Sequence, residues 1–244
     1  MRARIVGLGL IGGSIGIALR RAVGQVSYTD PHVPLADARA AGAADDDAPD
    51  GADITVLATP VDVALDALRQ TMGLATSVCS VMTPLRDEAG TRPFVAGHPL
   101  AGKATRGLAA ASGDLFRDKK WFVDREEQTV ARMIADCGAR LVIVDAAEHD
   151  AAVALTSHIP QILSTALAAY LEDRDVAAFA GTGLSTFLRL AASDASVWLP
   201  TIEANRANLD IHIDGLLDVV RRILDGHEDA FAKAASFMKR MDDR

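Results

Sequence analysis

Aromatic and basic residues are scarce in this chain. Phenylalanine, tryptophan and tyrosine make up 5% of the 244 residues, a composition that suits helix-rich α/β packing. Lysine and arginine number 25 against 33 aspartates and glutamates, so the formal net charge is −8. Because no dense basic run offsets that charge, we expect no nucleic acid partner.

Cysteine is scarcer still, and long hydrophobic runs are missing. Cys79 and Cys137 lie in apolar surroundings without disulfide or metal-site spacing, which predicts buried free thiols in a reducing cytoplasm. A strand predicted from residue 3 leaves no room for a signal peptide. Polar residues interrupt the helical stretches before the roughly 20 residues that cross a membrane. We therefore expect a cytoplasmic protein without a membrane partner.

The start of the chain contains a glycine-rich turn between a strand and a helix. The strand-like residues 4–6 lead into the pattern Gly-x-Gly-x-x-Gly at Gly7, Gly9 and Gly12, and apolar residues at helical spacing follow. The first glycine allows a tight turn, and the second lets the backbone approach a pyrophosphate. The third lets helix and strand pack closely. The pattern predicts a dinucleotide-binding turn.

The next two elements complete this predicted cofactor site. Free N–H groups at the helix start, where Leu10 and Ile11 lie, would face the phosphates. The second strand, residues 25–29, ends at Asp30, which follows Gly12 by 18 residues, close to the roughly 20 expected for the carboxylate that binds an adenosine ribose. An acid here favours NAD over NADP, because the 2′-phosphate of NADP would meet a like charge.

Strand and helix signals alternate up to residue 145, which predicts an α/β domain with a mostly parallel sheet over residues 1–145. Ligands bind beyond the carboxyl ends of parallel strands, so Thr59, Pro60, Ser80 and His98 should face one crevice. The further strands are expected at residues 53–58, 77–81, 93–97, 120–123 and 141–144, the helices at 33–41, 61–72 and 126–137, and a solvated turn at 45–47.

From Ala146 onward the sequence carries helix signals and no convincing strand. The clearest amphipathic stripe is formed by apolar residues at intervals of three and four within residues 209–223. Stripes over so many helical residues need more apolar surface than one small domain supplies. We therefore expect residues 146–244 to form an all-helical domain that makes a homodimer.

Three segments stand out beside the glycine turn. They are Gly97-His98-Pro99-Leu100-Ala101-Gly102, then Glu148-His149-Asp150 leading to Thr156-Ser157-His158-Ile159-Pro160, and finally residues 187–194 with Trp198 and Asn205. Their order and spacing resemble the prephenate/arogenate dehydrogenase family of tyrosine biosynthesis. The resemblance implies a Rossmann domain followed by a helical dimerisation domain. It also implies oxidative decarboxylation of a cyclohexadienyl acid with NAD or NADP.

The chemistry of prephenate suits the polar residues of these segments. When hydride leaves the carbinol carbon for nicotinamide, the carboxylate across the ring can depart as carbon dioxide, so aromatisation drives the reaction and no metal is needed. His98 is the candidate base for the hydroxyl proton, since an imidazole with an ordinary pKa near ~6.5 accepts one at neutral pH. Ser80 would contact the same hydroxyl.

Two further residues would hold the substrate. Arg189 lies among apolar residues, where an unpaired guanidinium would be costly, and would form a bidentate contact with a substrate carboxylate. By resemblance, His158 would contact the substrate side chain or order the pocket. His149 and Asp150 are expected to fix the domain junction.

The chain departs from the family pattern at three positions. Met82, Ala104 and Ser185 stand where members often carry a lysine, an acid and a base, respectively. The last two would pair across the pocket and be lost as a unit, because a lone survivor would be an uncompensated charge. These departures leave substrate preference and feedback by tyrosine open.

The leading prediction is an NAD-dependent prephenate dehydrogenase. An arogenate dehydrogenase, or an enzyme acting on an amino-substituted prephenate, stays open because the sequence does not settle whether the substrate side chain bears a keto or an amino group. Another two-domain dehydrogenase or an imine reductase would leave the joint presence of His98, His158 and Arg189 unexplained. The alternative of another class is a non-catalytic NAD-binding regulatory protein that kept the fold and lost turnover.

Overall fold

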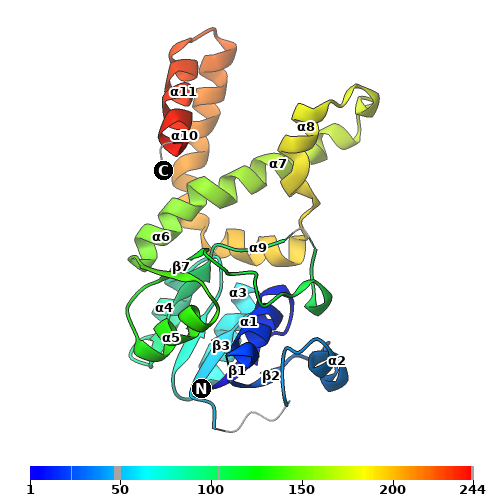
Figure 1. The fold of residues 1–244 in the computed structure, drawn as a ribbon. Coiled ribbons are helices and arrows are strands. Elements are labelled where there is room, and N and C mark those ends of the chain that lie inside the picture. The colour runs from blue at the N-terminus through cyan, green and yellow to red at the C-terminus, as the bar shows by residue number, and fades with distance from the viewer. Residues whose placement is uncertain (23, 47–50, 104, 243–244) are drawn as a thin grey trace.

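The first part of the chain forms a parallel sheet, as the strand signals predict. The computed structural model describes residues 1–22, 24–46, 51–103 and 105–242. The strands run in the order β2-β1-β3-β4-β5, so the strand order reverses between β1 and β3, where such sheets bind ligands (Figure 1). Their bounds are β1 (Arg2–Val6), β2 (Gln25–Thr29), β3 (Ile54–Leu57), β4 (Ala75–Ser77) and β5 (Phe94–Val95).

Four helices connect these strands and enclose an aliphatic core. Strand β3 is buried along its whole length, as expected for a central parallel strand covered on both faces. Ile5, Leu8 and Ile15 belong to one buried cluster, and Leu57 and Leu68 to a second. The helices are α1 (Leu10–Arg21), α2 (Leu35–Ala40), α3 (Val61–Gln70) and α4 (Thr83–Ala89).

A second, smaller sheet follows, and the prediction of one strand over residues 93–97 is wrong. The chain leaves the first sheet after Val95, because Ala96 donates its N–H to the Asp124 carboxylate (2.8 Å) and accepts the Asp124 N–H (3.0 Å). These bonds divert the chain into β6 (Gly97–Pro99), antiparallel to β7 (Lys120–Val123). Strand β7 pairs in parallel with β8 (Arg140–Ile143), and α5 (Gln128–Asp136) links the two.

The strand expected at residues 77–81 also has other bounds, since β4 ends at Ser77. Beyond this segment the N–H groups of Met82 and Thr83 donate to the carboxylate of Asp150, at 2.8 Å each, and tie the start of α4 to the helical part of the chain. Ser80 therefore lies in a loop between β4 and α4, and Asp150 of the helical part fixes the end of this loop.

Helices make up the rest of the molecule. The Asp145 carboxylate accepts the N–H groups of Ala147 and Glu148 and so caps the first helix. In the described residues after β8 there is no strand, as expected; the domain division at 145/146 stays a prediction. The elements are α6 (Ala146–Val153), a π-helical turn (Ala154–His158), α7 (Ile159–Glu172), 3-10 turns (Ala177–Phe179 and Leu188–Ala192), α8 (Thr182–Phe187), α9 (Ala195–Ala204), α10 (Arg206–Leu224) and α11 (Asp229–Asp242).

The first of these elements join into one continuous helix, Ala146–Glu172, of 27 residues. The expectation that polar residues keep every helical stretch below membrane-spanning length is therefore wrong, because the π-helical turn carries the chain through without a break. By length and composition alone this helix could cross a membrane. Buried core helices of proteins outside membranes meet the same criteria.

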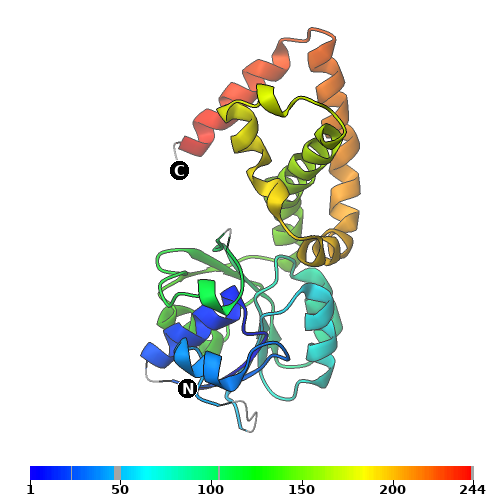
Figure 2. The same cartoon turned by 90° about the vertical axis from the view of Figure 1, so that its right-hand side faces the viewer.

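The far end of the helical part exposes many apolar side chains. Helices α10 and α11 form a hairpin that extends from the junction to the end farthest from the sheets (Figure 2). Leu209 near the base of α10 is 5% exposed, whereas Ile211 and Leu224 are 71% and 81% exposed. Further exposed apolar residues on this hairpin are Leu217, Val219, Val220, Ile223, Phe231, Phe237, Met238 and Met241. This apolar surface is the kind that a second subunit covers.

Both cysteines are buried and unpaired, which gives a direct chemical prediction. Burial raises the pKa of Cys79 and of Cys137 to about 12 each. At pH 8 only about 10⁻⁴ of each thiol is ionised, so neither should react quickly with Ellman's reagent in the native protein. We expect two reactive thiols after denaturation in guanidinium chloride; rapid labelling of either one in the native protein would contradict this packing.

Candidate active site

The glycine turn has the geometry of a phosphate-binding loop. Gly7 has φ +91°, a conformation that favours glycine, and its N–H donates to Thr29 O at 2.9 Å. A Cβ at Gly12 would lie 2.0 Å from Gly7 O, whereas a Cβ at Gly9 would meet nothing within 4 Å. The backbone is thus tightly packed at Gly12, whereas the space beside Gly9, at the start of α1, is open. A pyrophosphate would approach the turn through this space.

Asp30 lies at the end of β2 and helps to hold the turn. Its carboxylate accepts the N–H groups of Leu8 (2.7 Å) and His32 (2.8 Å). A surface cavity of about 370 Å³ lies beside it. Its lining contains one acid and no lysine or arginine: Tyr28, Thr29, Asp30, Pro31, Val33, Pro34 and Leu35. The residues present fit the adenosine end of a dinucleotide whose ribose carries no 2′-phosphate.

Two neighbouring loops border the same edge of the sheet. Thr59, directly after β3, lies so close to the turn that a Cβ at Gly7 would be 2.7 Å from its Cγ2. The Thr59 hydroxyl is buried without a partner in the described part of the chain, and the Thr59 carbonyl accepts the Cys79 thiol at 3.6 Å. Pro60 is exposed, and Ser80 is partly exposed. Thr59 therefore lies at the glycine turn; that Thr59, Pro60 and Ser80 contact a cofactor or substrate stays a prediction.

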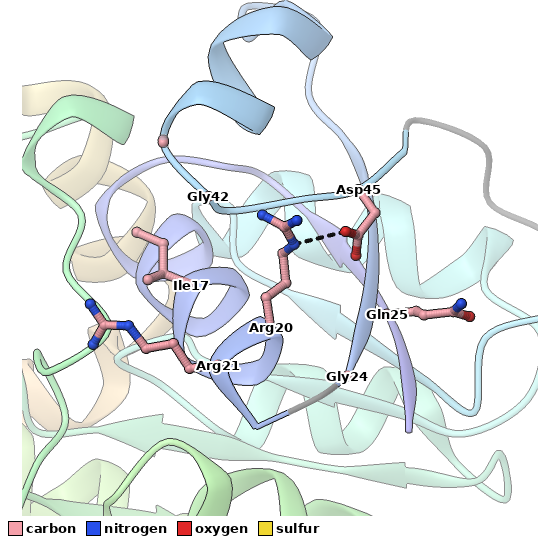
Figure 3. A pocket seen from close by; sticks show the side chains of 8 residues that line it. Ile17, Arg20, Arg21, Gly24, Gln25, Gly42 and Asp45 are labelled. Atoms are coloured by element: carbon pink, nitrogen blue, oxygen red, sulfur yellow. Dashed lines mark hydrogen bonds and ion pairs between the residues drawn. The ribbon is translucent and has the colours of Figure 1, made fainter.

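A larger cavity of about 680 Å³ lies at the other end of α1 and does not belong to this site. Figure 3 shows Arg20 directed toward Asp45 across it, in an ion pair of 2.8 Å. Asp45 also accepts the Val26 N–H at 2.9 Å. The predicted solvated turn at residues 45–47 is thus wrong for Asp45, which ties α1 to β2, and Asp47 lies outside the described residues.

His98 lies within β6 rather than past the end of a parallel strand, so that expectation is wrong. It still reaches the edge where ligands bind, because the Gly97 N–H donates to Ser77 Oγ (3.2 Å) at the carboxyl end of β4. The half-buried His98 ring meets His149 of α6, with His98 Nδ1 3.0 Å from His149 Nε2. The two rings are perpendicular, with centroids 5.1 Å apart.

His98 and His158 are held uncharged by their surroundings. Loss of solvation lowers the pKa of His98 to about 3, and His149 and His158 lower it further against the opposing effect of Asp150. Loss of solvation likewise lowers the pKa of His158 to about 4. Both imidazoles are therefore neutral at pH 7 and can accept a proton or a hydrogen bond.

His158 ends the π-helical turn and is fully buried. Its Nδ1 lies 3.0 Å from Asn205 Nδ2, which also donates to Asp150 O at 2.9 Å. Asn208 donates to Asn205 Oδ1 at 2.8 Å, and this fixes the amide so that its nitrogen faces His158. His158 Nε2 is buried without a partner among the described residues, so it can donate to a ligand.

Arg189 lies in the 3-10 turn after α8, and its side chain is exposed rather than enclosed by apolar residues, which corrects the prediction. Within the described residues its guanidinium forms no ion pair or hydrogen bond. Helix α7 holds the segment: Gln161 donates to Leu190 O (2.9 Å) and Ser164 to Phe187 O (2.9 Å). Neither His98 nor Arg189 lines the cavities described above, so their convergence on one substrate stays a prediction.

The three positions that depart from the family pattern have separate surroundings. Met82 is fully buried in the core under α4. Ser185 is exposed and donates to Gly181 O within α8. Ala104 lies outside the described residues, so its predicted pairing with position 185 remains a prediction.

His149, Asp150 and Asn205 have more contacts with the candidate site histidines than the sequence predicts. The first two were expected only at the domain junction, yet they form the immediate surroundings of His98, and Asn205 was given no role. The sequence does contain a signal for this role, since the adjacent ionisable residues His149 and Asp150 lie in a helix whose other residues are mostly apolar. Such residues are seldom fully buried unless they have a partner.

Models of two protein domains match nearly the whole chain. The one described as "Prephenate dehydrogenase, nucleotide-binding domain" matches residues 15–143, and "Prephenate dehydrogenase, dimerization domain" matches residues 145–234. "Probable prephenate dehydrogenase NovF" of Streptomyces niveus is 35% identical over 92% of this chain and 70% of that protein. The prephenate dehydrogenase of Lactococcus lactis subsp. cremoris is 30% identical over 82% of this chain and 64% of that protein.

A solved structure gives the same architecture. The prephenate dehydrogenase from A. aeolicus in complex with hydroxyphenyl propionate and NAD+ has a TM-score of 0.85 to this chain at 24% identity. The match covers 100% of this chain and 98% of that one. At this identity the likeness shows a shared fold, with a nucleotide-binding domain followed by a helical one.

Proposed function

The chain belongs to the prephenate dehydrogenase family, and from that premise we propose that it catalyses the NAD-dependent oxidative decarboxylation of prephenate to 4-hydroxyphenylpyruvate. The observation that carries the proposal is the meeting of His98, from the dinucleotide-binding half, with His149 of the helical half at 3.0 Å. A neutral base at the junction of a cofactor domain and a helical domain is what removal of a hydroxyl proton beside a nicotinamide requires.

Each residue then has a defined task. When bound, NAD supplies the nicotinamide that accepts hydride from the carbinol carbon. His98 Nδ1 is occupied by His149, so Nε2 is the nitrogen left to accept the substrate hydroxyl proton. Ser80 hydrogen-bonds the same hydroxyl, the buried His158 donates from Nε2 to the substrate side chain, and the unpaired Arg189 binds a carboxylate.

The cofactor is held by the turn and by Asp30. Backbone N–H groups from Gly9 to Gly12, including those of Leu10 and Ile11, face the pyrophosphate, and Thr59 and Pro60 border the nicotinamide end. The open space at Gly9 and the acidic lining of the cavity beside Asp30 support NAD as the preferred cofactor over NADP.

The protein also works as a homodimer in the cytoplasm. The exposed apolar side chains of α10 and α11 support the dimer, because they lie in the part that matches a dimerization domain. The two buried, unpaired cysteines support a reducing compartment.

The test is a rise in NADH absorbance that depends on both prephenate and NAD. Arogenate and an amino-substituted prephenate serve as parallel substrates, because the buried Met82 and exposed Ser185 offer no charge to distinguish a keto from an amino side chain. A higher kcat/KM for arogenate or for the amino-substituted prephenate than for prephenate would identify that compound as the preferred substrate. No turnover of any of the three, with NAD binding intact, would favour the regulatory protein.

Cofactor choice gives a second prediction. Asp30→Asn keeps an oxygen that can accept the Leu8 N–H and removes the charge that opposes a 2′-phosphate. We expect the ratio of kcat/KM for NAD to that for NADP to fall about tenfold, equivalent to ~1.4 kcal/mol. Asp37→Asn, at an exposed acid on α2, is the matched control and should leave the ratio unchanged. An unchanged ratio for Asp30→Asn would remove this residue from cofactor selection.

A further inference from the structure

Two buried side chains extend behind His98 into the helical half of the molecule. Asp150 Oδ1 lies 2.8 Å from His149 Nδ1, and His149 Nε2 lies 3.0 Å from His98 Nδ1. Asp150 is 1% exposed and His149 3% exposed, so water does not compete for these contacts. The three groups form a line of contacts from a carboxylate to the candidate base, and the carboxylate also accepts the N–H groups of Met82 and Thr83.

The direction of each hydrogen bond follows from Asp150. Burial raises the pKa of its carboxyl, but hydrogen bonds from His149, Thr83 and Met82 together outweigh burial and hold the pKa below its usual value. An ionised carboxylate only accepts, so His149 Nδ1 must donate to it. Where His149 holds one ring hydrogen, that hydrogen lies on Nδ1, so its Nε2 accepts and His98 Nδ1 donates. In that arrangement the lone pair of His98 is at Nε2.

We propose that His149 and Asp150 are positioning residues that hold His98 with its Nε2 lone pair toward the substrate and take over the proton charge that His98 acquires. This inference rests on the function proposed above. The substrate O–H bond breaks and the proton binds His98 Nε2, while the Nδ1 proton of His98 moves to His149 Nε2. The oxygen keeps the electron pair and forms a carbonyl as hydride leaves the carbinol carbon.

The remaining steps return every proton. The electron pair of the bond to the departing carbon dioxide enters the ring, and the ring becomes a phenolate. His98 Nε2 then gives its proton to the phenolate oxygen, and His149 Nε2 returns its proton to His98 Nδ1. The two imidazoles finish as they began, so the relay needs no added acid or base.

Electrostatics explain why His98 needs this support. Loss of solvation opposes a charge on His98, whose pKa falls to about 3. On His149 the same charge lies against the Asp150 carboxylate at 2.8 Å, and an opposite charge at that distance favours the protonated imidazole. The groups that act on His98 are His149, His158 and Asp150, and Asp150 is the one anion among them.

The resting hydrogen positions can be measured directly. The chain has six histidines, and ¹⁵N-histidine spectra distinguish the two neutral tautomers of each ring. We expect His98 and His149 to carry hydrogen on Nδ1 and His158 to carry it on Nε2, with assignments made from single substitutions. A resting His98 with hydrogen on Nε2 would overturn the proposal, whatever the activity of the enzyme.

Two substitutions of His149 separate positioning from charge transfer. The side-chain amide introduced by His149→Gln can accept the His98 Nδ1 hydrogen near the position of the imidazole Nε2 but cannot take its proton. We expect kcat to fall about 10- to 100-fold with KM nearly unchanged. His149→Leu offers no acceptor and frees the tautomer of His98, so kcat should fall about 10³- to 10⁴-fold.

The controls distinguish this inference from the proposed function. His227→Gln, at an exposed histidine between α10 and α11, should behave like the wild type. Thermal unfolding and NAD binding of each variant show whether it is folded. If either folded His149 variant keeps a kcat within threefold of the wild type, the relay is wrong. If the wild type oxidises none of the three substrates, the proposed function is wrong, and the NMR tautomers still test the hydrogen-bond line.

Discussion

His98→Asn should lower kcat for prephenate oxidation by about 10²- to 10⁴-fold, the range that a positioned general base contributes. The asparagine amide can still donate to His149 Nε2, so the junction should keep its packing while the proton acceptor is lost. Binding of NAD should stay within about twofold of the wild type, because the glycine turn and Asp30 are unaffected. Initial rates of NADH formation and calorimetric titration with NAD measure the two quantities.

The matched control for that experiment is His227→Asn, which changes an exposed histidine by the same substitution. If His98→Asn retained a third or more of the wild-type kcat, His98 would not be the base. A large loss of NAD affinity would instead indicate that the substitution disturbs the cofactor half.

A methyl group at Gly9 should weaken NAD binding with little effect on stability, whereas one at Gly12 should lower stability. Gly9 has φ −77°, which alanine adopts freely, and an added Cβ meets nothing within 4 Å. Gly9→Ala should therefore change the free energy of unfolding by less than ~1 kcal/mol. The same methyl would occupy the approach of the pyrophosphate, so the Kd for NAD should rise at least about tenfold.

At Gly12 the added Cβ would lie 2.0 Å from Gly7 O, a backbone atom that cannot move aside without opening the turn. Gly12→Ala should cost ~3 kcal/mol or more by overpacking. For a chain of this size that lowers the Tm by about 6–12 °C. Thermal melts and NAD titrations of the two variants would contradict this geometry if Gly9→Ala bound NAD normally or Gly12→Ala melted with the wild type.

Local patterns in the sequence predicted most of the first half of the fold. The glycine turn, Asp30 and Thr59 were predicted correctly at the edge of a parallel sheet, because short-range steric rules set the turn and strand periodicity sets the order of elements. Where residues 93–97 were assigned as one strand, the side chain of Asp124 redirects the backbone at Ala96, and directly after residues 77–81 the side chain of Asp150 holds the N–H groups of Met82 and Thr83. Those partners are distant in sequence, so no local window contains them.

The site divides in the same way. His98 and His158 were singled out by their motifs, whereas the burial and alignment of His149 and Asp150 depend on how α6 meets β6 and α4. Arg189 was expected in an apolar enclosure from its neighbours in sequence, but a 3-10 turn on the surface of α7 exposes it. The apolar residues next to Arg189 in the sequence therefore do not enclose its side chain.

The sequence by itself therefore determined the dinucleotide turn, the change from strands to helices and the identity of the candidate base, since each depends on residues close together in the chain. Only the tertiary structure decided which strand carries His98, which groups stand behind it and which nitrogen of its ring remains free. Those features arise from contacts between the two halves of the molecule, and long-range hydrogen bonds of buried groups fix them.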